Sequence, residues 1–283
     1  MRVQILLPFH NAALTLDAAL ASIAAQTFTD HELLLIDNAS SDDSPEVART
    51  WADRDPRIRL IHEPVIGIAH ALNTGLRHAT APLIARMDAD DTAHPERLAR
   101  QMAYLHEHPE IGVLGTRTTF TSTVPKNSGM RWFVNWQNAI LNPHDHYLKR
   151  FVDAAVAHPT VLFRRELIDR FGGYDTGPVP EDHEMWLRWM HHGVRFAKLP
   201  DALLTWCDRP DRLSRTHPNY GKAAFFTTKA IWLAKWYLRK YADRRPVIIA
   251  GTSTMCRERA RLLEAQGMRV DAFTDVRPRK VPG

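Results

Sequence analysis

Three carboxylates fall within four positions of the chain, at Asp88, Asp90 and Asp91, directly after the apolar run at residues 83–87. In open α/β sheets ligands collect where the strands end, so a cluster at this point suits a binding site. Like charges this close repel one another, and a hard divalent cation relieves the repulsion. Mg²⁺ and Mn²⁺ combine a few carboxylates with phosphate oxygens of a substrate, so the cluster predicts a site for such a cation and a diphosphate.

Two details of this cluster stay open on its residues alone. Strand alternation places Arg86, Asp88 and Asp90 on one side of the chain, although two aspartates around one residue is a weak pattern that occurs often by chance. Asp91 is either a member of the cluster or the cap of a helix that begins near Pro95.

A second polar group, Asp37 and Asn38, ends the apolar run at residues 33–36 and opens a polar loop at residues 39–43. This point again lies at the ligand-binding edge of a parallel sheet. A carboxylate here can accept a hydrogen bond from the imide N–H of a pyrimidine or from a ribose hydroxyl. The same residues also suit an Asx-turn that closes the strand.

Three acids stand at the start of a helical pattern, at Glu181, Asp182 and Glu184. Acids at a helix N-terminus often only balance the helix dipole. An acid aimed into a cleft can instead be a general base. A sugar hydroxyl that attacks an anomeric carbon must lose its proton as the bond forms, so sugar transfer needs such a base.

The elements that would position these residues alternate between β-rich runs and helical patterns through the first 115 residues. This alternation is typical of a parallel sheet with crossover helices, the second of which starts at Ser44-Pro45. Residues 116–150 lose the rhythm, and we interpret them as an insertion or mobile loop that governs acceptor choice. The predicted strands are residues 3–7, 33–36, 58–61, 83–87, 111–114 and 160–163, and later helices run from Arg164 to Gly172 and from about Asp182 to His192.

The C-terminal third is organised differently. A helical pattern at residues 219–244 is amphipathic and aromatic, and its basic part, residues 225–245, suits either peripheral contact with a membrane surface or packing with a solvated basic face. Residues 246–283 then predict a small, incomplete Rossmann-like βαβ unit. Its loop lacks the G-x-G-x-x-G spacing, so we expect no cofactor there.

Composition limits the class of protein. With 283 residues, 45% of them hydrophobic, the chain can bury the core of one large α/β domain or two modest ones. Two cysteines, Cys207 and Cys256, cannot form a disulfide framework, which indicates a reducing compartment. There is no signal-peptide pattern and no run of roughly 18 to 20 apolar residues, so we expect a cytoplasmic protein that does not cross a membrane. The net charge of +5 suits a phosphate-bearing ligand or an anionic membrane, or is an ordinary solvated face.

Six motifs occur in order along residues 1–215: IxLPFHNAxxTLxxALxSIxxQTF, LLLIDNASSDDS, GIAHALNTGL, ARMDADD, FGGYD and PEDHEMWLRW. Together they resemble the family 2 inverting glycosyltransferases of the GT-A fold, in the nucleotide-diphospho-sugar transferase superfamily. The resemblance implies a Rossmann-like α/β domain at residues 1–215 with a mostly parallel sheet flanked by helices. A C-terminal helical arm at residues 216–245 and the βαβ unit would follow it.

The resemblance also implies roles for residues on the donor side. Pro8 and Asn11 match positions beneath the nucleotide base, with His10 in place of the family's usual tyrosine. Asp37 matches the aspartate that reads the base, most often uracil. Asp88 matches the first aspartate of the D-x-D motif, near the ribose and the metal. The metal ligands would be Asp88 and Asp90, and the nucleotide-sugar-binding residues Pro8, Asn11, Asp37, Arg86 and Asp88.

On the acceptor side, Asp182 matches the family's catalytic base, with Glu181 beside it and Glu184 as an acceptor contact. The basic segment at residues 206–215 matches a flexible loop over the diphosphate, or is a solvated loop. Arg212, Arg215 and His217 are its candidates for the diphosphate.

These observations predict a glycosyltransferase that depends on Mg²⁺ or Mn²⁺ and moves a hexosyl group with inversion. Its donor would be a nucleotide-diphosphate sugar, with UDP favoured, and its acceptor a hydroxyl of a saccharide or lipid-linked saccharide in bacterial polysaccharide or glycan assembly. It would work in the cytoplasm, with peripheral contact at the inner membrane face through residues 225–245 left open, and without a nucleic-acid partner. The alternatives are a sugar nucleotidyltransferase, whose glycine- and lysine-containing phosphate loop is missing at residues 9–15, and a catalytically inactive nucleotide-sugar-binding protein.

Overall fold

The computed structural model of the chain describes residues 2–242 and 245–275. Its backbone packs as two compact units. The first comprises the chain up to Gly177 together with Glu181–Arg212, and the second comprises Pro178–Pro180 together with the chain from Leu213.

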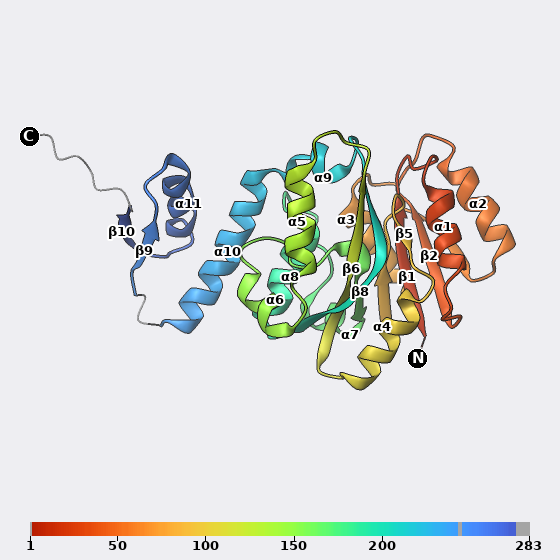
Figure 1. Cartoon of the computed structure of the whole chain (residues 1–283), viewed down its shortest axis with the longest axis horizontal. Helices are drawn as coiled ribbons and strands as arrows, with labels where there is room; N and C mark the ends of the chain where they lie inside the picture. The colour runs from red at the N-terminus through yellow and green to blue at the C-terminus, as the bar shows by residue number, and fades with distance from the viewer. Residues whose placement is uncertain (1, 243–244, 276–283) are drawn as a thin grey trace, which may run out of the picture. The chain divides into compact units, whose positions relative to one another are not determined.

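The first unit is built on one mixed, mostly parallel sheet flanked by helices, as Figure 1 shows, which confirms the predicted α/β fold class. The strand order is β3-β2-β1-β4-β7-β6-β8-β5, in which the first four strands are mutually parallel and β7 and β5 are antiparallel to their neighbours. The strands are β1 Val3–Phe9, β2 His31–Asp37, β3 Ile58–His62, β4 Leu83–Arg86, β5 Thr92–Ala93, β6 Ile111–Ser122, β7 Leu162–Arg164 and β8 Arg195–Asp208.

Helices cross between these strands in the order that the sequence predicts. The predicted start at Ser44 is confirmed, and a left-handed Gly172 (φ +82°) follows the end of α7. The helices of this unit are α1 Leu16–Ala24, α2 Ser44–Arg54, α3 Ile68–His78, α4 Arg97–Glu107, α5 Ser128–Asn138, α6 Pro143–Lys149, α7 Glu166–Phe171 and α8 Glu181–His191.

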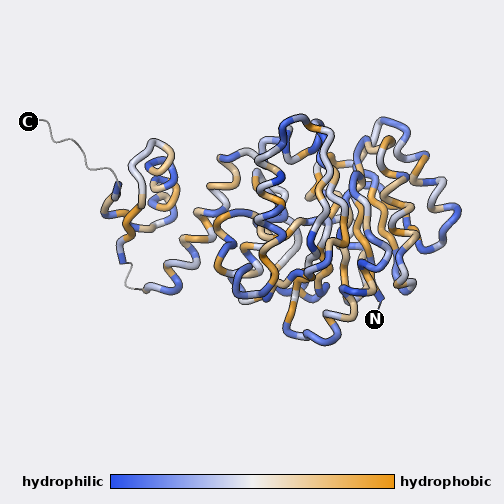
Figure 2. The backbone as a smooth tube through the Cα atoms, in the orientation of Figure 1, coloured by the Kyte–Doolittle hydropathy of each residue, from blue (hydrophilic) through white to orange (hydrophobic). Residues whose placement is uncertain are grey.

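The core of this unit forms a layer on each face of the sheet. Odd-numbered residues of β1, such as Ile5 and Leu7, belong to one apolar cluster with residues of α1 and α4. Leu6 belongs to the other, with residues of α3 and α8 that include Trp186. Because both faces are covered, β1 is buried throughout and is apolar except at Gln4, and Figure 2 shows hydrophobic residues concentrated along the sheet.

One sequence-based prediction in this unit is wrong, and one strand was missed. Residues 116–150 are not a loop, because β6 continues to Ser122 and the helices α5 and α6 follow it. The threonines that break the helical rhythm fit an extended strand, whose β-branched side chains favour that conformation. The sequence also gave no sign of β8, which pairs with β6 along its length through several shifts of register.

The second unit contains α9 Leu213–Thr216, the long helix α10 Lys222–Lys240, and a βαβ unit of β9 Val247–Ala250, α11 Thr254–Glu264 and β10 Val270–Thr274. The two strands are parallel, as predicted. The basic helix is shorter than predicted, since Tyr241 leaves the helical conformation (φ −123°, ψ 81°), and Arg244 lies outside the described residues. Among the residues that the structure describes, no helix has the length and apolar character needed to cross a membrane.

The packing of β6 leads to a test of the core. A Cβ atom on Gly115 would lie 2.5 Å from Cγ2 of Val156 and 3.1 Å from Oγ1 of Thr160. We expect Gly115→Ala to lower the free energy of unfolding by about 1–3 kcal/mol, because overpacked cores must shift their neighbours. The matched control is Gly129→Ala in α5, where no described atom lies within 4 Å of the added carbon. Thermal unfolding followed by circular dichroism should show a lower Tm for the first variant only, and equal values would contradict the packing.

Candidate functional site

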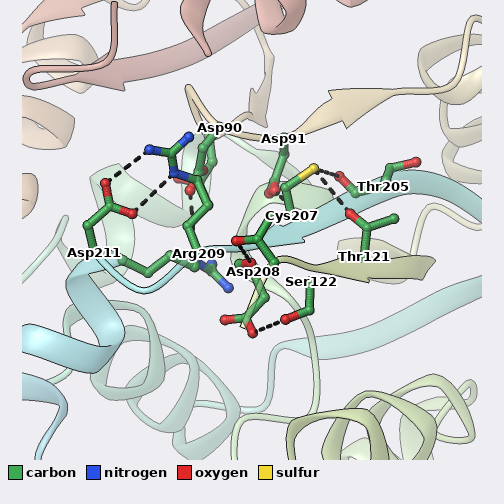
Figure 3. Close-up of polar contacts among 12 residues, drawn as sticks. Asp90, Asp91, Thr121, Ser122, Thr205, Cys207, Asp208, Arg209 and Asp211 are labelled. Atoms are coloured by element: carbon green, nitrogen blue, oxygen red, sulfur yellow. Dashed lines mark hydrogen bonds and ion pairs between the residues drawn. The ribbon is translucent and has the colours of Figure 1, made fainter. Parts of the chain in front are cut away.

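The predicted carboxylate cluster forms at the turn between β4 and β5. One oxygen each from Asp88, Asp90 and Asp91 can be chosen so that all three lie within 4.8 Å of one another. Asp91 is fully buried, and its Oδ1 accepts the backbone N–H of Cys207 at 2.8 Å (Figure 3). Its Oδ2 is also buried and has no hydrogen-bond partner among the described residues.

Burial and mutual repulsion act on the carboxylates of this cluster. Burial, and then the negative charge of Asp88, raise the pKa of Asp90 to about 6. The same two causes raise the pKa of Asp91 well above its usual range. A buried carboxylate oxygen without a partner, beside two further carboxylates, fits a hard divalent cation. The interpretation of Asp91 as a helix cap is wrong, because α4 begins at Arg97 and the residue before it is Glu96.

Arg86 lies at the centre of the site. Its guanidinium is buried and donates a hydrogen bond to Asp88, so the structure brings these two predicted residues together. Burial lowers the pKa of Arg86, but the charge of Asp88 and the neighbouring Tyr174 and Glu181 raise it above its ordinary value overall. The guanidinium of Arg86 therefore interacts both with Asp88 after β4 and with the charge of Glu181 in the first turn of α8.

Arg97 is a second buried cation, which sequence reasoning missed. Its guanidinium donates to the backbone carbonyl of Arg86 at 2.6 Å and to Oε1 of Gln101 at 3.3 Å. Burial lowers its pKa to about 9, while the charge of Asp91 acts in the opposite direction. Arg97 stands in the first turn of an amphipathic helix, where an arginine normally faces water, so the sequence carries no signal for this role.

Asp37 ends β2 and Asn11 lies in the loop after β1, and hydrogen bonds join this loop to the loop that follows β2. One oxygen of Asp37 accepts the N–H of Ser40 at 3.0 Å, and the other lies 3.3 Å from Nδ1 of His62. Asn11 adopts a left-handed conformation (φ +49°), and its side-chain oxygen accepts the N–H of Ser41 at 2.8 Å. The carboxylate of Asp37 thus closes an Asx-type turn and also stands at the carboxyl end of β2, so the two interpretations are compatible.

The remaining residues near this edge support the loops. Pro8 is buried in β1 opposite Ile36 of β2. Nδ1 of His10 lies 2.7 Å from the carbonyl oxygen of Asn38, so the histidine contacts the second loop directly. The buried side chain of Asn38 bonds the backbone of Val65, Gly67 and Glu63, which gives it a structural task.

Asp182 stands in the first turn of α8, half-buried. Burial raises its pKa to about 6, Arg86 acts to lower it, and the charge of Asp88 acts to raise it. The charges of Arg86 and Asp88 both act on the Asp182 carboxyl group, and its role as a catalytic base stays a prediction. A carboxyl group with a pKa near 6 is well suited to accept a proton near neutral pH.

Glu181, the neighbour of Asp182, faces a buried polar group. Its Oε1 lies 4.0 Å from Nδ1 of His158, whose Nε2 lies 2.8 Å from the hydroxyl of Tyr174. Burial lowers the pKa of His158 well below its usual range, so the ring is neutral. Tyr174 was not predicted as a site residue, although its place in the FGGYD motif was a usable signal.

Glu184 forms an ion pair within α8, and its role as an acceptor contact stays a prediction. Its carboxylate is 2.9 Å from Nη2 of Arg188, one helical turn further along α8. Arg188 in turn donates to the carbonyls of Gly172 at 3.1 Å and Gly173 at 2.6 Å. Glu184 therefore orients Arg188, whose hydrogen bonds hold the backbone of Gly172 and Gly173, the residues that precede Tyr174.

The predicted flexible loop at residues 206–215 begins as ordered strand, since β8 runs to Asp208. Beyond it, the guanidinium of Arg212 lies 4.6 Å over the ring of Trp206, and its Nε is 3.9 Å from Oδ2 of Asp90. Figure 3 shows Arg209 turned instead toward Asp211, with which it forms an ion pair at 3.1 Å. Arg212 is thus the diphosphate candidate that the structure brings to the cluster.

The other two candidates for the diphosphate, Arg215 and His217, belong to the second compact unit. Nδ1 of His217 accepts the backbone N–H of Asn219 at 3.2 Å. Their role toward a diphosphate stays a prediction.

A mostly parallel α/β sheet with acids at its strand ends agrees with the GT-A fold that the sequence motifs imply. The model of glycosyl transferase family 2 matches residues 4–172, and the chain belongs to this family. Family membership favours the glycosyltransferase interpretation over the nucleotidyltransferase alternative.

Two relatives illustrate the similarity. The amylovoran biosynthesis glycosyltransferase AmsE of Erwinia amylovora is 32% identical over 190 residues, which cover 67% of this chain and 69% of AmsE. The O-antigen biosynthesis glycosyltransferase WbnJ of Escherichia coli is 26% identical over 256 residues, which cover 87% of this chain and 91% of WbnJ.

Solved structures share the fold. The structure of S. aureus TarS residues 1–349 in complex with UDP-GlcNAc matches with a TM-score of 0.68 at 17% identity, over 94% of this chain and 71% of that one. The mannosyltransferase PcManGT from Pyrobaculum calidifontis, in complex with GDP-Man and Mn²⁺, matches with a TM-score of 0.58 at 23% identity, over 94% of this chain and 73% of that one.

The carboxylate cluster leads to a test of metal binding. We expect Mn²⁺ to raise the Tm of the wild-type chain, because a ligand at about 100 times its Kd stabilises the folded state by about 2.7 kcal/mol. Asp90→Asn should lose most of this increase. Asp211→Asn, which removes an exposed carboxylate paired with Arg209, is the matched control and should keep it. An equal response of all three proteins to Mn²⁺ would place the metal elsewhere.

Proposed function

We propose that this glycosyltransferase is metal-dependent and inverting, and that it moves a hexosyl group from a UDP-sugar to a hydroxyl acceptor. The observation that carries the proposal is the cluster of Asp88, Asp90 and Asp91 beside the buried Arg86, together with the raised pKa of Asp182, on which Arg86 and Asp88 both act. This arrangement sets a proton acceptor beside the residues suited to the departing diphosphate.

On the donor side, Asp37 would read the base from the carboxyl end of β2, above Pro8 and Asn11. The complexes of TarS with UDP-GlcNAc and UDP support a uridine nucleotide. A carboxylate suits the imide N–H of uracil, because an ionised carboxylate only accepts hydrogen bonds. Arg86 and Asp88 would contact the sugar and ribose end of the donor.

Asp88 and Asp90 would hold Mg²⁺ or Mn²⁺, as the Mn²⁺ complex of PcManGT supports. When bound, such a cation neutralises the charge that develops on the departing diphosphate. The guanidinium of Arg212 would add a second positive charge near Asp90 and would donate hydrogen bonds to the phosphate oxygens.

In the bond-forming step Asp182 would take the proton of the acceptor hydroxyl as its oxygen attacks the anomeric carbon. A single displacement from the face opposite the diphosphate inverts that carbon and needs no covalent intermediate on the protein. Glu181 would border the acceptor, whereas Glu184 keeps the glycine loop in place through Arg188.

The biological setting is polysaccharide or glycan assembly, as the names of AmsE and WbnJ support. The acceptor would be a saccharide or a lipid-linked saccharide, and the chain would act in the cytoplasm. The basic helix α10 would offer peripheral contact with the inner membrane face, with lysines such as Lys235 beside the ring of Trp232 (4.0 Å).

The base assignment is tested by Asp182→Asn. We expect kcat to fall by about 10²–10⁴-fold, the usual contribution of a positioned general base, while UDP binding measured by calorimetry is retained. The matched control is Asp169→Asn on α7, an exposed carboxylate paired with Arg165, which should keep full activity. Proton NMR of the product should show the inverted anomeric configuration. Unchanged turnover of Asp182→Asn would reject the assignment.

The raised pKa of Asp182 predicts a pH dependence. A carboxyl group with a pKa of about 6 is protonated below that pH and then cannot accept a proton, so kcat/KM should fall about tenfold per pH unit below 6. The measurement is a profile from pH 5 to 8 at saturating Mn²⁺, with UDP binding measured at each pH so that donor loss is separated from base loss. A flat profile with intact donor binding would contradict this role.

A further inference from the structure

A cavity of about 720 Å³ opens beside the end of β6 and the first turns of α5. Cavities of roughly 300–1,000 Å³ are the usual size for small-molecule ligands. The mechanism above uses none of the residues that line it. Those that matter for a ligand are Ser122, Lys126, Asn127, Arg131, Trp132 and Asn135.

The loop at residues 122–127 forms one wall of this cavity and is held in place by hydrogen bonds. Asp208, at the end of β8, is buried and accepts hydrogen bonds from the hydroxyl of Ser122 at 2.8 Å and from the amide of Asn127 (Figure 3 shows the first). Between these anchors Lys126 adopts a left-handed backbone conformation (φ +54°). Such a conformation is unfavourable for a lysine and persists where the surrounding structure enforces it.

The lining has a definite chemical character. It carries two cations, Lys126 and Arg131, and no carboxylate among the described residues that form it. Trp132 is 68% exposed, which leaves a large aromatic face open to a ligand. The side-chain amide of Asn135 adds neutral hydrogen-bonding groups. A flat aromatic face suits the C–H face of a sugar ring, and paired cations suit an anionic group on that sugar.

The cavity is joined to the reaction centre through β8. Cys207 donates its backbone N–H to Asp91 of the carboxylate cluster, and the next residue, Asp208, holds the cavity wall. Consecutive residues of one strand therefore bind the cluster and the cavity wall. A ligand in the cavity lies on the β6–β8 side of the cluster, whereas Asp37 and Asn11 lie on the β1–β2 side.

We infer that this cavity is a binding subsite for an anionic saccharide, whose ring packs on Trp132 and whose carboxylate or phosphate pairs with Lys126 and Arg131. Its use as an acceptor subsite rests on the proposed glycosyltransferase reaction. The binding itself follows from the lining residues alone.

The test is saturation-transfer NMR on the full chain with three probes: glucuronate, glucose 1-phosphate and methyl glucoside. We expect signal from at least one anionic probe and much weaker signal from the neutral one. Trp132→Ala and the double variant Lys126→Gln/Arg131→Gln should each weaken anionic binding by about tenfold or more, which corresponds to about 1.4 kcal/mol. Which anionic probe responds distinguishes a carboxylate from a phosphate.

Two controls keep the test specific. Trp132→Phe retains an aromatic face and should bind within about threefold of wild type, a difference below 1 kcal/mol. Arg49→Gln removes an exposed arginine on α2, outside the cavity, and should change nothing. All these side chains are exposed, so an unchanged Tm checks that each variant folds.

The inference is overturned if neutral and anionic probes bind equally, or if Trp132→Ala and the double variant bind like wild type. A parallel sugar-transfer assay separates this outcome from a failure of the proposed function. Anionic binding that depends on Trp132 in a chain without transfer activity would keep the subsite and reject the reaction. Transfer activity with no such binding would do the reverse.

Discussion

The ion pair between Arg86 and Asp88 is the interaction on which the site depends. Arg86 ends the central strand β4 with its guanidinium fully buried, and a buried cation is tolerated only with close charge compensation. Asp88 supplies that compensation, and the backbone carbonyl of Arg86 accepts a hydrogen bond from the guanidinium of Arg97. The pair fixes the turn after β4, and this turn presents Asp90 and Asp91 in a poorly hydrated place where their pKa values rise.

Burial on both faces of the sheet explains which strands could be predicted from the sequence. Strands such as β1 and β2 are buried on both faces, so each contains an apolar run, residues 5–9 and 33–36, that is visible in the sequence. By contrast, β8 contains Lys198, Pro200 and Asp201, and its pairing with β6 shifts register along its length. Its stability comes from a partner about eighty residues earlier, and no local pattern of residues records that pairing.

The site shows a similar division. The grouping of Asp88 and Asp90 at the carboxyl end of β4 was predictable because acids that directly follow an apolar strand lie at the edge of the sheet. Arg97 was not, because a buried arginine looks like a surface arginine until the structure shows its partners. The role of Glu184 also depended on a partner, Arg188, whose own contacts with the glycine loop are tertiary.

The two halves of the sheet have separable tasks. The parallel strands β3-β2-β1-β4 carry Asp37, Asp88 and the buried Arg86, and changes there disturb the core on both faces. The distal ends of β6 and β8 have exposed neighbours, and the loop at residues 122–127 is held chiefly through Asp208. Side chains such as Arg131 and Trp132 project from this support without contributing to the core. Because the backbone of β8 reaches Asp91, substitutions in that loop can alter what binds beside the reaction centre while the carboxylates stay in place.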